Sequence, residues 1–281
     1  MEVQKFKEEL QKVNGLSIGD YIVFNDYELY NLKTNKEKQF NSFEELLNHK
    51  IRGITIENII KNIDEFNYNL AGGRGASGSQ GSGSLFKGQH QNHKDNSKYD
   101  IPAKMNKMYG GNKMSFDNTL KNFKNAHLLS DKEHAVGVDK DGFVQIYKHG
   151  NKGSVGWNVD ELAGKHIIHN HPSDGYSAFS KADLITTATT KATGITATSS
   201  QYDYVFNKKH NFDAKGFVKA VNTASGTGNY NEDVHKFLKS NAKKYGYSYY
   251  RKSNSKITSN MKLDKKANNK LQDFRKQIGL A

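Results

Sequence analysis

The chain has 281 residues, 25% of them charged and 35% hydrophobic, and a formal net charge of +13. We expect no transmembrane helix and no cleaved secretory signal, because no apolar run approaches bilayer length and the amino terminus lacks an apolar stretch. Cysteine is absent, which excludes disulfides and thiolate metal sites and leaves His, Asp and Glu as candidate metal ligands.

The first residues, 1–67, have the pattern of a small α+β domain. Their apolar residues recur with helical spacing in some segments, and other segments are short runs of strand-forming residues. We expect helices at residues 3–13, from Ser42 onward and at 54–63, and strands at 21–24 and 27–32. The domain is acidic, since residues 1–70 hold 9 Lys and Arg against 12 Asp and Glu. We interpret it as a docking module with its own partner.

Residues 68–99 have a different composition. Residues 71–84 are almost entirely Gly, Ser and Ala, which is typical of a flexible linker, and residues 88–99 are polar without a core pattern. A phosphate-binding loop is the functional alternative for the glycines. It is excluded because no Gly-Lys-Ser or Gly-Lys-Thr ending and no buried strand are present.

A second domain is expected over residues 100–228, where strands and helices alternate. Asp139 to Gly142 is a hairpin turn, because Asp-Gly between two apolar runs is a strong hairpin signal. We expect strands at residues 135–138, 143–147, 154–157, 166–170, 194–199 and 202–206, and helices at 116–126, 181–192 and 212–221. The predicted fold class is α+β or α/β, with a mixed sheet flanked by helices.

The remaining residues, 229–281, are expected to be a basic helical region, with helices at 231–244 and 260–278. Residues 236–281 hold 13 Lys and Arg against 2 Asp and Glu. Such a segment favours polyanions, so nucleic acid, either DNA or RNA, is a candidate partner. A solvated charged helix with no such partner explains the composition equally well.

The chemistry of the second domain is concentrated at the end of the strand 166–170. Alternate side chains of a strand share a face, so His169 and His171 point the same way, and Pro172 ends the strand. Ser180 is well placed to cap the next helix, and Asp183 in its first turn can face back toward the histidines. Two His and one Asp provide three ligands and leave a fourth position to water, as catalytic zinc requires.

At these residues the chain resembles the JAMM (MPN, JAB) metalloprotease family, whose pattern is an upstream Glu, then His-x-His, a short loop and Ser-x-x-Asp. The run His-Asn-His-Pro-Ser is similar to the bacterial RadC-like branch. The resemblance covers roughly residues 115–225 and implies a cytidine-deaminase-like sheet. It implies that His169, His171 and Asp183 bind Zn²⁺. It also implies that Glu133 is the general base and that Ser180 supports the oxyanion.

Two features leave alternatives open. The loop from His171 to Ser180 is one residue longer than is common in the family, so Ser173 or Ser177 remains a candidate for a role near the metal. Glu161 and Asp131 are rivals of Glu133 for the general base. The letters His-Asn-His also suggest a nuclease, but HNH nucleases spread these residues along a ββα unit.

We therefore expect a zinc-dependent metallopeptidase or isopeptidase-like hydrolase that acts on a protein or peptide. The competing hypothesis is a non-catalytic JAMM-fold protein that is structural or binds nucleic acid, such as a virion protein or an ejected DNA-binding protein. The N-terminal domain is similar in pattern to small accessory proteins of bacteriophages and mobile elements. The expected location is the bacterial cytoplasm, or the virion if a phage encodes the chain.

Overall fold

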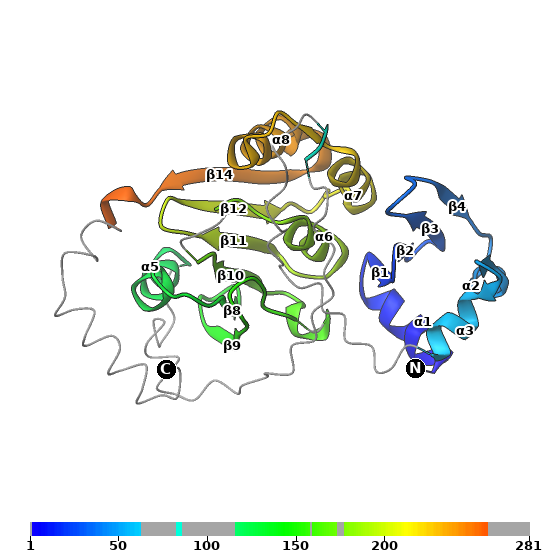
Figure 1. Cartoon of the computed structure of the whole chain (residues 1–281). Helices are drawn as coiled ribbons and strands as arrows, with labels where there is room; N and C mark the ends of the chain where they lie inside the picture. The colour runs from blue at the N-terminus through cyan, green and yellow to red at the C-terminus, as the bar shows by residue number, and fades with distance from the viewer. Residues whose placement is uncertain (1, 63–82, 86–115, 158, 173–176, 258–281) are drawn as a thin grey trace.

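The computed structural model describes residues 2–62, 83–85, 116–157, 159–172 and 177–257, and Figure 1 shows their arrangement. They form a mixed α+β structure with a four-stranded sheet and a six-stranded sheet. None of the helices in these residues is long and apolar enough to cross a bilayer. Most of the predicted linker and the helix predicted at 260–278 lie outside the described residues.

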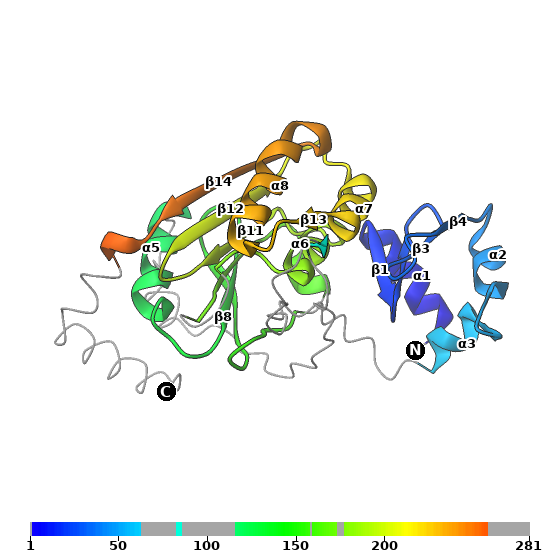
Figure 2. The same cartoon turned by 45° about the horizontal axis from the view of Figure 1, so that its top comes forward.

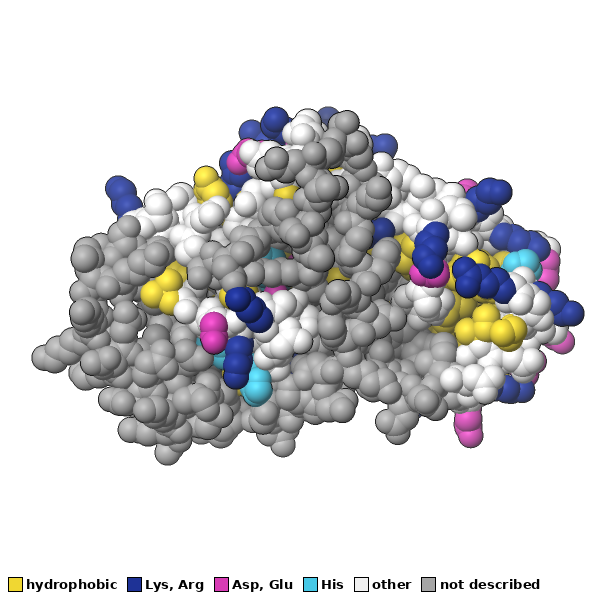
Figure 3. Space-filling model, viewed as in Figure 1, with side chains coloured by type: hydrophobic (Ala, Val, Ile, Leu, Met, Phe, Trp, Pro, Cys, Tyr) yellow, Lys and Arg dark blue, Asp and Glu magenta, His cyan; other side chains and the backbone are white. Residues whose placement is uncertain are grey.

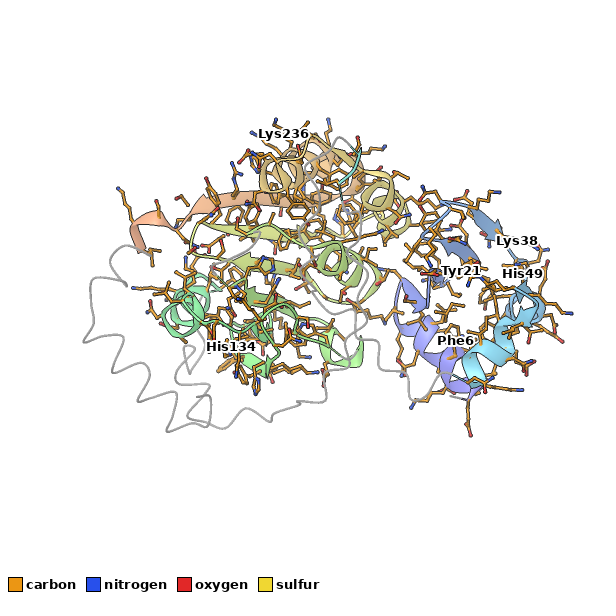
Figure 4. The ribbon with its side chains drawn as sticks, viewed as in Figure 1. Phe6, Tyr21, Lys38, His49, His134 and Lys236 are labelled. Atoms are coloured by element: carbon orange, nitrogen blue, oxygen red, sulfur yellow. The ribbon has the colours of Figure 1, made fainter. Side chains whose placement is uncertain are left out.

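The N-terminal unit is an antiparallel meander packed against helices. Its strands follow the chain in the order β1-β2-β3-β4, and its core contains Phe6, Leu10, Val23, Leu46 and Ile60. Figure 4 labels Phe6 and Tyr21 within this unit. Its elements are α1 (Val3–Lys12), β1 (Gly15–Ile18), β2 (Tyr21–Phe24), β3 (Glu28–Asn31), β4 (Glu37–Gln39), α2 (Phe43–Asn48), β5 (Lys50–Ile51), β6 (Ile54–Thr55) and α3 (Ile56–Lys61).

Side-chain caps explain where the short helices of this unit begin. Ser42 accepts a hydrogen bond from the Glu45 backbone N–H at 3.1 Å, which confirms the predicted cap. Thr55 accepts in the same way from the Asn58 N–H at 3.2 Å. The last helix therefore begins at Ile56 and not at residue 54 as predicted, because residues 54–55 pair with 50–51 in a small hairpin.

The larger unit is built on a six-stranded sheet with the order β14-β12-β11-β10-β8-β9. Strands β10 and β11 are parallel, and the other neighbours are antiparallel. The elements are β7 (Gly83–Ser84), α5 (Phe116–His127), β8 (His134–Val138), β9 (Val144–His149), the 3-10 helix η1 (Val159–Leu162), β10 (His166–Asn170), α6 (Lys181–Thr189), β11 (Gly194–Thr198), β12 (Tyr202–Lys208), α7 (Ala214–Thr223), β13 (Ser225–Gly226), α8 (Tyr230–Tyr245) and β14 (Tyr247–Ser253).

Helices cover both faces of the central strands, which explains why every residue of β10 and β11 is buried. On one face Ile168 of β10 packs with Phe123 of α5. On the other face Ile167 joins a core that includes Leu184 of α6 and Leu238 of α8. Figures 1 and 2 show α5 apart from the group formed by α6, α7 and α8. The sheet is thus the middle layer of three.

Two expectations about this unit differ from the structure. Residues 154–157, predicted to be a strand, form none. The sheet also continues past the expected boundary at residue 228, because β14 pairs with β12 from Tyr247 to Ser253 and α8 buries Val234 in the same core. The described part of the basic C-terminal region is therefore integral to the larger unit.

The acidic N-terminal unit packs against the α6–α7 side of the larger unit (Figure 2). The Asn14 N–H donates to the Thr189 carbonyl at 2.7 Å, and Asn222 of α7 donates to the Leu32 carbonyl at 2.8 Å. Lys215 and Lys219 of α7 both form ion pairs with Glu28. The acidic unit thus makes its contact with basic residues of its own chain.

The turn after β9 contains a glycine that no other residue can replace without rearrangement. A Cβ atom on Gly150 would lie 1.7 Å from the Ser154 carbonyl oxygen. We expect Gly150→Ala to lower the free energy of unfolding by about 1–3 kcal/mol, the usual effect of overpacking, as measured by urea denaturation. The control is Gly137→Ala, whose closest new contact is the flexible Lys165 side chain at 3.2 Å. Equal destabilisation by both variants would contradict this account of the turn.

Candidate metal centre

Strand β10 ends at the two histidines singled out from the sequence. The His171 N–H donates to the Thr198 carbonyl of β11 at 2.7 Å, which extends the regular backbone one residue beyond the strand. Pro172 then provides no N–H to continue the ladder. Because alternate residues share a face, His169 and His171 both project toward α6.

The start of α6 directs a carboxylate back toward these histidines. Ser180 accepts from the Asp183 N–H at 3.1 Å, and Asp183 Oδ2 accepts from the Ser180 N–H at 2.7 Å and from its hydroxyl at 2.9 Å. This reciprocal pair is a capping box, which fixes both side chains at the helix N-terminus. The predicted cap is therefore confirmed, and the Ser180 hydroxyl is a donor to Asp183 in this geometry.

The three predicted ligands converge. His169 Nε2 lies 2.9 Å from His171 Nε2 and 3.4 Å from Asp183 Oδ1, and His171 Nε2 lies 3.8 Å from Asp183 Oδ2. Donors bound tetrahedrally to one zinc ion lie about 3.4 Å apart, given bond lengths near 2.1 Å. Within the described residues this is the one cluster of His, Asp or Glu able to hold a metal ion.

Burial and charge complement this geometry. The three side chains are at most 4% exposed. Burial raises the pKa of the Asp183 carboxyl, but the adjacent His169 and His171 and the bond from Ser180 together lower it to about 2. Asp183 is therefore ionised at neutral pH, as a carboxylate metal ligand must be. Apolar side chains, among them Trp157, line a small pocket together with His169 and Asp183.

Glu133 immediately precedes β8, the strand next to β10, at the same end of the sheet. Ala135, the partner of His169 where β10 pairs with β8, packs in the core that contains Leu184 of α6. Glu133 precedes Ala135 by two residues, and alternate residues of an extended segment share a face, so Glu133 is expected on the face that carries the three donors. Its side chain is fully buried.

The rival residues are in less suitable positions. Glu161 forms a buried ion pair with Lys148 at 2.9 Å, so its carboxylate is already engaged by a cation. Asp131 is exposed. Ser177 is held by α8, since its N–H donates to Asn231 at 3.0 Å. Ser173 lies outside the described residues.

Sequence reasoning missed one residue of this region, Asn170. Strand alternation places it on the other face of β10 and suggests no role for it, yet it is fully buried and bonds to the backbone on both sides of Glu133. The available signal was an amide at the end of a buried strand, because buried polar groups are almost always hydrogen-bonded.

Comparison of the chain with protein-family models, curated proteins and solved structures finds no match.

We expect the purified protein to bind about one Zn²⁺ per chain and His169→Ala combined with His171→Ala to abolish this binding, as measured by titration calorimetry. Bound zinc at 100 times its dissociation constant should stabilise the fold by about 2.7 kcal/mol. Affinity should fall as the pH drops below neutral, because imidazole must be neutral to bind a metal, whereas the pKa of Asp183 is only about 2.

The control is His210→Ala, because this histidine is exposed and distant in sequence from the cluster. Zinc stoichiometry that persists in the double variant at His169 and His171 would disprove the metal site.

Proposed function

We propose that the chain is a zinc-dependent metallopeptidase or isopeptidase-like hydrolase of the JAMM/MPN type. The observation that carries the proposal is the buried convergence of His169, His171 and Asp183 at a strand end and a helix start. The position of Glu133 on the same face of the sheet supports it. A mixed sheet with helices on both faces is compatible with the family's fold.

The donor set fits zinc. Two imidazole nitrogens and one carboxylate oxygen, without thiolates, are the kind of ligands found in catalytic zinc sites with three protein ligands. When bound there, zinc would supply a Lewis acid that polarises a carbonyl and lowers the pKa of a water molecule.

The chain's own residues would handle the protons and orient the groups. Glu133 would accept a proton from the attacking water while the water oxygen forms a bond to the scissile carbonyl carbon. Glu133 would then donate that proton to the leaving amine as the carbon–nitrogen bond breaks. Ser180 would support the oxyanion by turning toward it the hydroxyl proton that is donated to Asp183 Oδ2 in this structure.

We expect Glu133→Gln to leave zinc binding intact but to slow hydrolysis about 100- to 10,000-fold, the usual contribution of a general base. The assay incubates zinc-loaded protein with a proteome-derived peptide mixture and identifies new termini by mass spectrometry. Asp131→Asn is the matched control, because this exposed rival carboxylate should not affect cleavage. Cleavage that survives in Glu133→Gln would refute the assignment of the base.

A second candidate function is supported by one surface. Four exposed lysines lie along one side of α8 at helical spacing, and no acidic residue occurs between residues 234 and 257. Figure 3 shows Lys and Arg side chains over α8 at the top of the molecule, where Figure 4 labels Lys236. The four lysines are Lys236, Lys239, Lys243 and Lys244. A row of cations of this kind favours the phosphates of nucleic acid.

Replacement of these four lysines by Gln should weaken binding to duplex DNA and make it less dependent on salt. The slope of log affinity against log salt should fall by about 0.9 for each phosphate that the variant no longer neutralises, as measured by fluorescence anisotropy. The control replaces four exposed lysines of the N-terminal unit, Lys33, Lys36, Lys38 and Lys50. An equal decrease of affinity in both variants would show that DNA binding depends on net charge alone and not on the α8 surface.

A further inference from the structure

Asn170 stands between the two histidines of the candidate metal centre, but its side chain lies on the opposite face of β10. It is fully buried. Its Oδ1 accepts a hydrogen bond from the His134 N–H at 2.7 Å, and its Nδ2 donates to the Lys132 carbonyl at 2.9 Å. Both contacts are with main-chain groups of the segment that leads into β8.

These bonds replace a backbone ladder that ends at this point. The pairing of β10 with β8 stops at His169 and Ala135. Beyond it the His171 N–H is directed to Thr198 of β11, and Pro172 has no N–H to offer. A side-chain amide carries a donor and an acceptor, as a peptide group does. The amide of Asn170 therefore continues the ladder after the backbone of β10 can no longer do so.

The residue held by this arrangement is Glu133. On the β10 side, the Asn170 amide bonds to the peptide groups of the two residues that flank Glu133, Lys132 and His134. On the β9 side, the Glu133 N–H donates to the Asn151 carbonyl at 2.9 Å, and its carbonyl accepts from the Gly150 N–H at 2.8 Å. The main chain of Glu133 is thus fastened from both directions. The hydrogen bonds of Asn170 connect the Glu133 segment to β10, the strand that leads to His169 and His171.

We propose that Asn170 is a positioning residue, which sets the Glu133 carboxylate against the metal centre through the backbone on either side of it. The inference rests on the proposed function, in which Glu133 is the general base. Loss of the amide leaves a buried N–H and a buried carbonyl unbonded and frees the Glu133 segment on one side. Removing groups that orient a metal site from outside its ligands typically costs 10- to 100-fold in activity or affinity.

The test compares Asn170→Ala and Asn170→Leu with Glu133→Gln and with a matched control, Asn254→Ala. Asn170→Leu keeps the branched shape of the buried side chain and removes both hydrogen-bonding groups without adding a charge. Asn254 is an equally buried amide that donates to a backbone carbonyl, that of Ser199 at 2.9 Å, away from Glu133. Urea denaturation of all variants measures the loss of stability, so that it can be separated from the loss of positioning.

The first readout is independent of activity. Each protein is loaded with Co²⁺, and the visible spectrum is followed as azide is added. A carboxylate about 4 Å from the anion weakens its binding at least about fivefold by charge repulsion, even at the dielectric constant of water. We expect azide to bind Glu133→Gln about fivefold more tightly, and Asn170→Ala and Asn170→Leu at least about twofold more tightly, than wild type. Asn254→Ala should bind azide as wild type does.

The second readout is cleavage of a peptide identified with the zinc-loaded protein. Asn170→Ala should lower kcat about 10- to 100-fold with little change in KM. Azide binding and kcat at wild-type values in both Asn170 variants, with Glu133→Gln altered, would overturn the role of Asn170 alone. A protein that takes up no Co²⁺ would overturn the proposed function, and this inference with it. So would azide binding that is equal in wild type and Glu133→Gln.

Discussion

The candidate centre depends on the reciprocal hydrogen bonds between Ser180 and Asp183. A carboxylate in the first turn of a helix would ordinarily extend into solvent, but here it accepts from the Ser180 N–H and hydroxyl and is turned back over the helix N-terminus. The positive end of the helix dipole favours the charge there. The same residue pair therefore begins α6 and presents an ionised oxygen to the two histidines of β10.

Strand β10 has two tasks, and strand geometry separates them. Residues on one face, His169 and His171, meet the carboxylate of α6, while Ile168 on the other packs with Phe123 of α5. Asn170 lies on that second face as well, and its buried polar amide bonds to backbone groups and not to solvent. A shift of one residue in register would exchange the two faces. The pairing of β10 with β8 therefore fixes both the packing of Ile168 and the position of the histidine nitrogens.

The parts of the site that were predictable from the sequence are those governed by local rules. Strand alternation predicted that His169 and His171 share a face, and the spacing of Ser180 and Asp183 predicted the capped helix. Strand β14 was missed because it is an edge strand with only Tyr247 fully buried, so it carries little apolar periodicity. The role of Asn170 was missed because its partners are 36 and 38 residues away, and one sequence does not show which backbone a buried amide will meet.

The helix that carries Asp183 is also supported from a distance. Lys181, next to Ser180, donates to Asn222 of α7, and Asn222 donates in turn to the Leu32 carbonyl of the N-terminal unit. Buried polar groups are costly unless every member is bonded, so the first turn of α6, the α7 contact and the N-terminal sheet stabilise one another. The acidic unit is therefore part of the structure that holds the carboxylate in place, and its ion pairs with Lys215 and Lys219 strengthen the same contact.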